Sequence, residues 1–273
     1  MNGLTIHEYT LKIPGVAPKV LYHFSDAHLN LSDADSCEQE RDTAAQRAKN
    51  WENGRKQFAL GYGEPYGEAQ QRSALQHFDA LLELAQTDGD ALVIAGDAFD
   101  YINEAHHRFY DTRFSALTVP YLYVCGNHEY DGEIITGSKL DEITRPVQML
   151  DLGDVLLVGF NDAQRVITKE QLDCLAALLE GDKPLILAMH IPIQTADNVT
   201  MARCDDYFRI NYPGAPAENL AFCELIQSRA DKIAAVLAGH LHFLNACTLA
   251  PGLVQFVSSQ GITGHINRYH IGE

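Results

Sequence analysis

The stretch ALVIAGDAFD at residues 91–100 decides the fold class, because five apolar residues lead directly into a glycine and two carboxylates. An apolar run without polar alternation is typical of a strand that is covered on both faces. Four more runs have this form, and each leads into polar residues: 20–24 into Asp26 and His28, 121–125 into Asn127 and His128, 185–189 into His190, and 233–238 into His240 and His242. The pattern predicts buried strands with polar side chains at their carboxyl ends.

Amphipathic segments lie between these runs. Helical periodicity predicts helices at residues 73–86, 106–117, 168–179 and 217–229, the third opening with the capping box TKEQ. Further strands are expected at 155–159, 243–249, 253–257 and 265–271, the last three forming an antiparallel portion of the same fold. Alternating strands and helices indicate a layered α/β fold, and without repeats or linkers we expect one domain over residues 1–273.

Two long excursions, residues 30–72 and 192–216, fit neither pattern, and the first is expected to be partly helical around residues 44–58. Long excursions inside a compact domain are commonly lids or binding loops, so we expect both to be lid or substrate loops. Solvent-exposed packing is an equal alternative for the first excursion. Its tryptophan, Trp51, is expected to anchor a helix to the body of the protein.

The charge of the chain restricts its partners. With 37 acidic and 20 basic residues, the formal net charge is −17. Such a surface repels nucleic acid and anionic membranes, so no nucleic acid is expected as a partner. A small anionic substrate stays possible, because bound cations reverse the sign of the charge locally.

The location of the protein is predicted from its apolar segments and its cysteines. The N-terminal residues lack an apolar stretch of signal-peptide length, and no segment reaches the length of a membrane span. Six cysteines are scattered without a Cys-x-x-Cys pair, and we expect them to be reduced core thiols. A cytoplasmic protein is therefore expected.

The polar residues at the strand ends form a candidate metal site. In open α/β sheets the carboxyl ends of the strands converge on one crevice, so five runs would deliver their side chains to one place. The set contains four imidazoles, two carboxylates and a carboxamide: Asp26, His28, Asp97, Asn127, His190, His240 and His242. Such ligands without a thiolate suit Mn, Fe, Co, Ni or Zn, and seven of them suit two ions.

As an ordered set, these motifs resemble those of the calcineurin-like metallophosphoesterases. The resemblance spans residues 20–242 and includes Asp26-x-His28, Gly96-Asp97, Gly126-Asn127-His128-Glu129, His190 and Gly239-His240-x-His242. It implies a four-layer α-β-β-α sandwich of two mixed β-sheets flanked by helices, with the site at the strand ends. It also implies two divalent or trivalent ions, the first bound by Asp26, His28, Asp97 and His242 and the second by Asp97, Asn127, His190 and His240.

The resemblance further implies hydrolysis of a phosphomonoester or phosphodiester by a hydroxide that bridges the two metals. His128 lies outside the ligand set and would assist the leaving oxygen, with Asp100 orienting it. Glu129 is expected to support its loop. The resemblance leaves open the substrate, the metal in each site and the oligomeric state.

At three places the sequence departs from the motifs of a particular subfamily, and each departure argues against assigning the chain to that subfamily. Asp100 replaces the iron-binding tyrosine of purple acid phosphatases, and Tyr101-Ile102 replaces the Arg-Gly of protein Ser/Thr phosphatases. His128 replaces the arginine typical of lipid A pathway hydrolases. The broad group of bacterial-type phosphoesterases remains. A non-catalytic metal-binding scaffold of the same fold is an alternative, and a nuclease is a third, disfavoured by the acidic charge.

Overall fold

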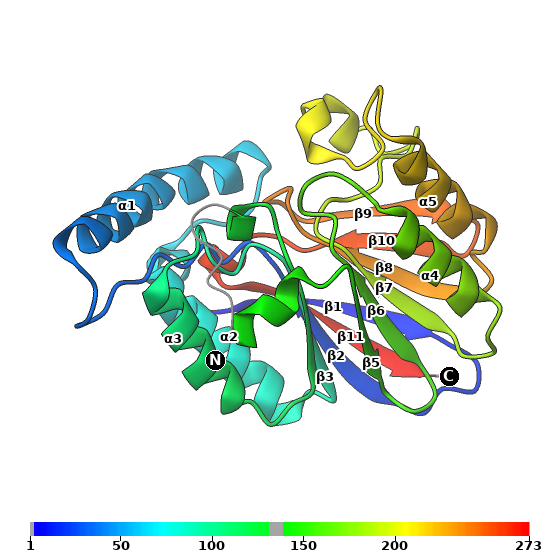
Figure 1. Ribbon diagram of the computed structural model, residues 1–273, viewed down its shortest axis with the longest axis horizontal. Coiled ribbons are helices and arrows are strands. Elements are labelled where there is room, and N and C mark those ends of the chain that lie inside the picture. The colour runs from blue at the N-terminus through cyan, green and yellow to red at the C-terminus, as the bar shows by residue number, and fades with distance from the viewer. Residues whose placement is uncertain (1–2, 131–138, 273) are drawn as a thin grey trace.

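The computed structural model describes residues 3–130 and 139–272 and contains two β-sheets packed face to face (Figure 1). The first sheet has the order β1 (Thr5–Lys12), β11 (His265–Gly272), β2 (Lys19–Phe24), β3 (Ala91–Ala95) and β4 (Tyr121–Val124). The second has the order β5 (Val147–Asp151), β6 (Leu156–Phe160), β7 (Leu185–Ala188), β8 (Ile233–Ala238), β10 (Leu253–Val257) and β9 (Asn245–Ala250). Both sheets combine parallel and antiparallel pairs.

Four helices cover the outer faces of the sheets. Figure 1 shows α2 (Ala74–Asp88) and α3 (Glu104–Ser115) beside the first sheet, and α4 (Lys169–Leu179) and α5 (Ala217–Ser228) beside the second. The predicted capping box opens α4: the Thr168 hydroxyl accepts from the Gln171 amide, and the Gln171 side chain accepts from the Thr168 amide. These reciprocal bonds satisfy donors that the first helical turn leaves unpaired.

Alternate strand residues face different cores, and this produces the layers. In β3, Leu92 and Ile94 pack with the residues of α2 and α3, whereas Val93 faces the space between the sheets. In β7, Leu187 packs towards α4 and α5, whereas Ile186 faces the other sheet. The central strands are covered on both faces, so the predicted four-layer α-β-β-α arrangement is confirmed.

The direction of the strands brings the polar loops together. In the first sheet β2, β3 and β4 run parallel, and in the second β6, β7 and β8 run parallel. Within each group the carboxyl ends therefore lie at one edge of the sheet.

Two strands were not predicted, and one was assigned to the wrong neighbours. Both β1 and β5 are edge strands with mostly half-buried or exposed residues, so neither has a continuous apolar run. The expected antiparallel pairing holds for β9 and β10, but β11 crosses to the first sheet. There β11 pairs parallel with β1 and antiparallel with β2, a long-range choice that its local sequence does not encode.

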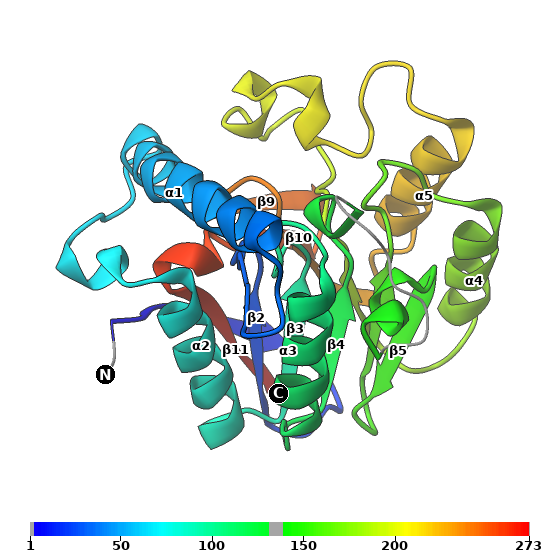
Figure 2. The same cartoon turned by 60° about the vertical axis from the view of Figure 1, so that its left-hand side comes forward.

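The longest helix, α1 (Glu38–Gly61), lies outside the four layers (Figure 2). Only Ala44, Arg55 and Ala59 are buried among its residues. It extends well beyond the predicted range of 44–58 and fills much of the first excursion. The second excursion contains the short 3₁₀ turns η4 (Met201–Arg203) and η5 (Asp206–Phe208).

No helix in the described part of the chain is both long enough and apolar enough to cross a membrane. All six cysteines are free, but the expectation of core thiols holds only for Cys125 and Cys223. Cys37, the residue before α1, is exposed, and the other three are half-buried.

The buried histidine His265 makes the stability of the fold depend on pH. It is 1% exposed, and burial, followed by repulsion from His7, lowers its pKa to about 3. The unfolded chain takes up a proton there below pH ~6.5, whereas the folded chain does not, so acidification favours unfolding. As the pH falls from 6 to 5, both proteins should lose unfolding free energy. We expect the loss in His265→Gln to be smaller than in the wild type by up to about 1.4 kcal/mol per pH unit.

Urea denaturation of both proteins at pH 7, 6 and 5 measures this difference. Comparing slopes with pH separates the titration from any constant loss of packing in the variant. Parallel curves for the two proteins would show that His265 titrates normally in the fold.

Candidate metal centre

Five strand ends deliver polar side chains to one edge of the molecule. In the first sheet, Asp26 and His28 follow β2, Asp97 follows β3 and Asn127 follows β4. In the second sheet, His190 follows β7, and His240 and His242 follow β8. Side chains from both sheets therefore meet in one cluster, which is buried except for the half-buried Asn127.

The first group of the cluster consists of Asp26, His28, Asp97 and His242, whose ligand atoms all lie within 4.8 Å of one another. Nε2 of His242 is 3.2 Å from Oδ1 of Asp26 and 3.1 Å from Nε2 of His28. All four residues are buried. They are the residues that the resemblance assigns to the first ion.

The second group consists of Asp97, His190 and His240. Nε2 of His190 lies 3.2 Å from Oδ2 of Asp97 and 3.1 Å from Oδ1 of Asn127. Its other ring nitrogen, Nδ1, is 2.7 Å from the carbonyl of Ala95 and is thereby oriented. Asp97 belongs to both groups, so one carboxylate connects them.

Most of the candidate ligands have a left-handed backbone conformation, which is uncommon for residues other than glycine. Six non-glycine residues in the described chain have φ between 43° and 71°, and five of them are candidate ligands: Asp26, His28, Asp97, His240 and His242. Such left-handed conformations cost free energy and are concentrated at functional sites. The surrounding strands and loops must therefore impose this geometry.

Two glycines allow the loops to approach closely. A Cβ atom on Gly96 would lie 2.3 Å from Nδ1 of His190, and one on Gly126 would lie 2.1 Å from Oδ1 of Asp97. Both distances are too short for non-bonded atoms, and Gly96 also has a φ of +86°. Any larger residue at either position would displace a candidate ligand.

Two buried carboxylates hold the ligand loops. Glu129, expected to support its loop, accepts hydrogen bonds from the amides of Asp97, Phe99 and Gly126 and from the Tyr123 hydroxyl. Asp162 accepts from the amides of His190 and Ile191 at 2.8 and 2.9 Å. The sequence analysis missed Asp162, although its position just after β6 was a usable signal.

Electrostatic interactions favour charged carboxylates in this buried site. Burial alone would raise the pKa of Asp26, but the nearby imidazoles, His242 first, lower it to about 2. Burial likewise opposes ionisation of Asp97, yet attraction by His190 holds its pKa well below the usual range. Burial lowers the pKa of His28 to about 4 and that of His240 to about 3, so both imidazoles are neutral and available as ligands.

In Asp26 and in Asp97, one carboxylate oxygen accepts hydrogen bonds from the protein and the other does not. Oδ2 of Asp26 accepts hydrogen bonds from Ser25 and His240, and Oδ1 of Asp97 accepts one from the amide of His128. Their other oxygens are buried and accept no hydrogen bond of good geometry, although an imidazole nitrogen lies 3.2 Å from each. A buried oxygen that accepts no hydrogen bond and lies next to an imidazole nitrogen is what a binding site for a metal ion with nitrogen and oxygen ligands would provide.

The proposed leaving-group residues lie beside the first group. Nδ1 of His128 is 2.8 Å from Oδ1 of Asp100, which is also 3.5 Å from Nδ1 of His28. The His128 side chain is 28% exposed, whereas those of Asp100 and His28 are buried. Burial would lower the pKa of His128, but its hydrogen bond to Asp100 raises the pKa to about 9.

Both excursions reach the cluster. From the first, Trp51 stacks on His28 with a centroid distance of 3.8 Å, and Phe58 contacts His242 at 4.9 Å. Trp51 thus anchors α1, as expected. From the second, the ring of Tyr207 lies 5.2 Å from that of His240.

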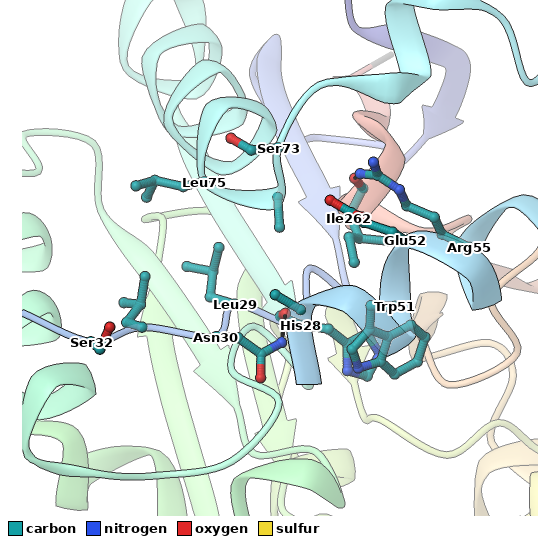
Figure 3. Close-up of a pocket in the computed structure, with 13 residues that line it drawn as sticks. His28, Leu29, Asn30, Ser32, Trp51, Glu52, Arg55, Ser73, Leu75 and Ile262 are labelled. Atoms are coloured by element: carbon teal, nitrogen blue, oxygen red, sulfur yellow. Dashed lines mark hydrogen bonds between the residues drawn. The ribbon is translucent and has the colours of Figure 1, made fainter. Parts of the chain in front are cut away.

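A cavity of about 370 Å³ lies under α1 and is lined by His28 of the cluster and by Trp51, which stacks on it (Figure 3). Figure 3 shows the two rings side by side, with Arg55 of the same helix further along the cavity. The cavity thus borders the cluster on the side of α1.

Comparisons with known proteins agree with this arrangement. Residues 19–244, more than half of the chain, match the calcineurin-like phosphoesterase family, and the chain therefore belongs to it. No curated protein matched the chain.

Several solved structures are similar to this one. A dimetal phosphatase from Danio rerio is 13% identical with a TM-score of 0.48, covering 90% of this chain and 88% of that one. A phosphopantetheinyl hydrolase from Mycobacterium tuberculosis is 12% identical with a TM-score of 0.43, covering 89% and 90%. A 5'-nucleotidase from Candida albicans is 10% identical with a TM-score of 0.42, covering 95% and 46%.

The shared carboxylate predicts how metal content responds to substitution. Asp97→Asn should remove more metal than any other single change, because Asp97 belongs to both groups. Asp26→Asn should mainly affect one group, and His128→Ala should keep the wild-type content. Metal analysis by mass spectrometry after loading with Mn²⁺ and desalting measures the ions per chain. Equal metal loss in Asp97→Asn and His128→Ala would contradict these assignments.

Proposed function

We propose that this calcineurin-like phosphoesterase uses two transition-metal ions to hydrolyse a phosphomonoester or phosphodiester. The observation that carries the proposal is the position of Asp97, which joins two groups of imidazole and carboxylate ligands next to His128. A scaffold protein that only binds metal has no chemical need for a proton donor at this place.

The chain offers enough ligands for both ions. Asp26, His28, Asp97 and His242 would hold the first, and Asp97, Asn127, His190 and His240 the second. When bound, two such ions would activate water for attack and withdraw charge from the phosphoryl oxygens. Imidazole, carboxylate and carboxamide ligands are compatible with Mn, Fe, Co, Ni and Zn, so the choice among these metals is left to experiment.

His128 is the residue that we assign to the leaving oxygen. Its Nδ1 faces Asp100, so its Nε2 is the atom that is left to donate to the substrate. Against the effect of burial, the hydrogen bond to Asp100 raises the pKa of His128 to about 9 and so favours the protonated imidazole. Donation from a positioned imidazolium neutralises the charge that develops on the leaving oxygen.

The two long excursions would determine the class of phosphoester. Trp51 and Phe58 from the first and Tyr207 from the second already contact candidate ligands. We propose that both excursions act as lid or substrate loops of one domain. The net charge of −17 disfavours nucleic acid as the substrate.

The proposal is tested with protein loaded separately with Mn²⁺, Fe²⁺, Co²⁺, Ni²⁺ and Zn²⁺. We expect hydrolysis of p-nitrophenyl phosphate or bis(p-nitrophenyl) phosphate with at least one of these metals, and its loss in Asp97→Asn. His128→Ala should keep its metal and lose about 10²–10⁴-fold in kcat on esters with poor leaving groups. If fully loaded protein hydrolyses no tested ester above background, the scaffold alternative replaces the enzyme.

A further inference from the structure

Helix α1 presents one face to the candidate site. Arg47, Trp51, Arg55 and Phe58 recur every three or four residues and therefore share that face. Figure 2 shows α1 crossing the molecule outside both sheets. Since few of its residues are buried, contacts with the site replace the usual core packing of a helix.

The contacts of Arg47 converge on Asp100. Nη1 of Arg47 donates to the backbone carbonyl of Asp100 at 2.8 Å and lies 3.6 Å from its Oδ2. The guanidinium group also lies over the ring of Tyr101, 4.8 Å from its centroid. Arg47 therefore holds the backbone and the carboxylate of Asp100 together.

Trp51, one turn later, contacts both imidazoles that compete for Asp100. Its ring stacks on His28 with 22° between the planes and lies 5.9 Å from the ring of His128. A hydrogen bond from Trp51 also contributes to the low pKa of Asp100, after burial, which opposes it, and after His128 and His28. The only polar group of this side chain is the indole N–H, so the indole is the donor.

Asp100 has two possible imidazole partners, and its orientation decides between them. Oδ1 is 2.8 Å from His128 and 3.5 Å from His28, and Nδ1 of His28 has no hydrogen-bond partner of its own. A small rotation of the carboxylate would transfer the bond from His128 to His28. The contacts from α1 oppose that rotation, because Arg47 holds Asp100 and Trp51 holds the ring of His28.

We propose that Arg47 and Trp51 are positioning residues that keep Asp100 directed at His128, and that α1 is a cap that completes the catalytic site. This inference rests on the proposed function, because it needs His128 as the proton donor. It assigns a role to two residues that lie far from the family motifs in the sequence. Neither residue needs to touch the substrate.

The test compares two leaving groups within the ester class that the Mn²⁺-loaded protein hydrolyses. The p-nitrophenyl ester has a good leaving group and needs little help from an acid, whereas the phenyl ester has a poor one. We expect Arg47→Met and Trp51→Phe to lose about 10-fold or more in kcat on the phenyl ester and less than about 3-fold on the p-nitrophenyl ester. KM should stay unchanged, and His128→Ala should show the same selectivity more strongly.

Two substitutions provide matched controls. Lys49→Met removes a positive charge from an exposed position of the same helix and should behave as wild type. Arg47→Lys keeps the charge and should recover part of the phenyl ester activity. Equal losses on both esters, or a rise in KM, would assign Arg47 and Trp51 to folding or to substrate contact and overturn the inference.

A second measurement does not depend on activity. Trp51 is the only tryptophan of the chain, so its fluorescence reports the contact with His28 directly. Titration with paramagnetic Mn²⁺ should quench this emission as the first ion binds. An emission that stays unchanged at saturating Mn²⁺ would overturn the proposal that α1 is a cap on the site. Wild-type protein inactive on every ester would overturn the proposed function and this inference together, whereas wild-type activity without leaving-group selectivity in the variants would overturn the inference alone.

Discussion

The two buried carboxylates Asp26 and Asp97 are the constraint on which the rest of the structure depends. Each has one oxygen satisfied by the protein and one that faces imidazole nitrogens without a hydrogen bond of good geometry. Unpaired buried oxygens are costly, so the site requires positive charge. The parallel strands bring both carboxylates to one edge of the molecule, and the close-approach glycines and the five left-handed residues shape the loops that carry the candidate ligands.

Much of this site could be predicted from the sequence, because apolar strands and the residues after them are local signals. The motif residues from Asp26 to His242 come together although they are far apart in the chain. The apolar runs and the helices between them predicted a layered α/β fold, whereas the four layers were implied by the resemblance to the family. What local sequence could not provide was the position of β11, because strand order is decided by pairing between distant segments. The edge strands β1 and β5 lacked the apolar run on which detection relied.

The contributions of α1 were hidden for a different reason. Arg47 and Trp51 lie in a polar segment whose apolar periodicity is weak, and only their spacing of one helical turn placed them on a common face. The pair of Asp100 and His128 was expected from the resemblance, but the second imidazole beside Asp100, that of His28, was not. The contacts of Arg47 and Trp51 depend on where α1 packs on the rest of the protein, and the sequence of the helix alone does not determine that position.

The division of the cluster between the two sheets has a consequence for folding. Asp97 is contributed by the first sheet, whereas His190 and His240 are contributed by the second, and the candidate ligands span the chain from Asp26 to His242. Contacts with such large sequence separation form late and slowly. A complete set of ligands for either ion therefore exists only after the two sheets have packed together. Metal binding would stabilise the assembled molecule rather than start its assembly.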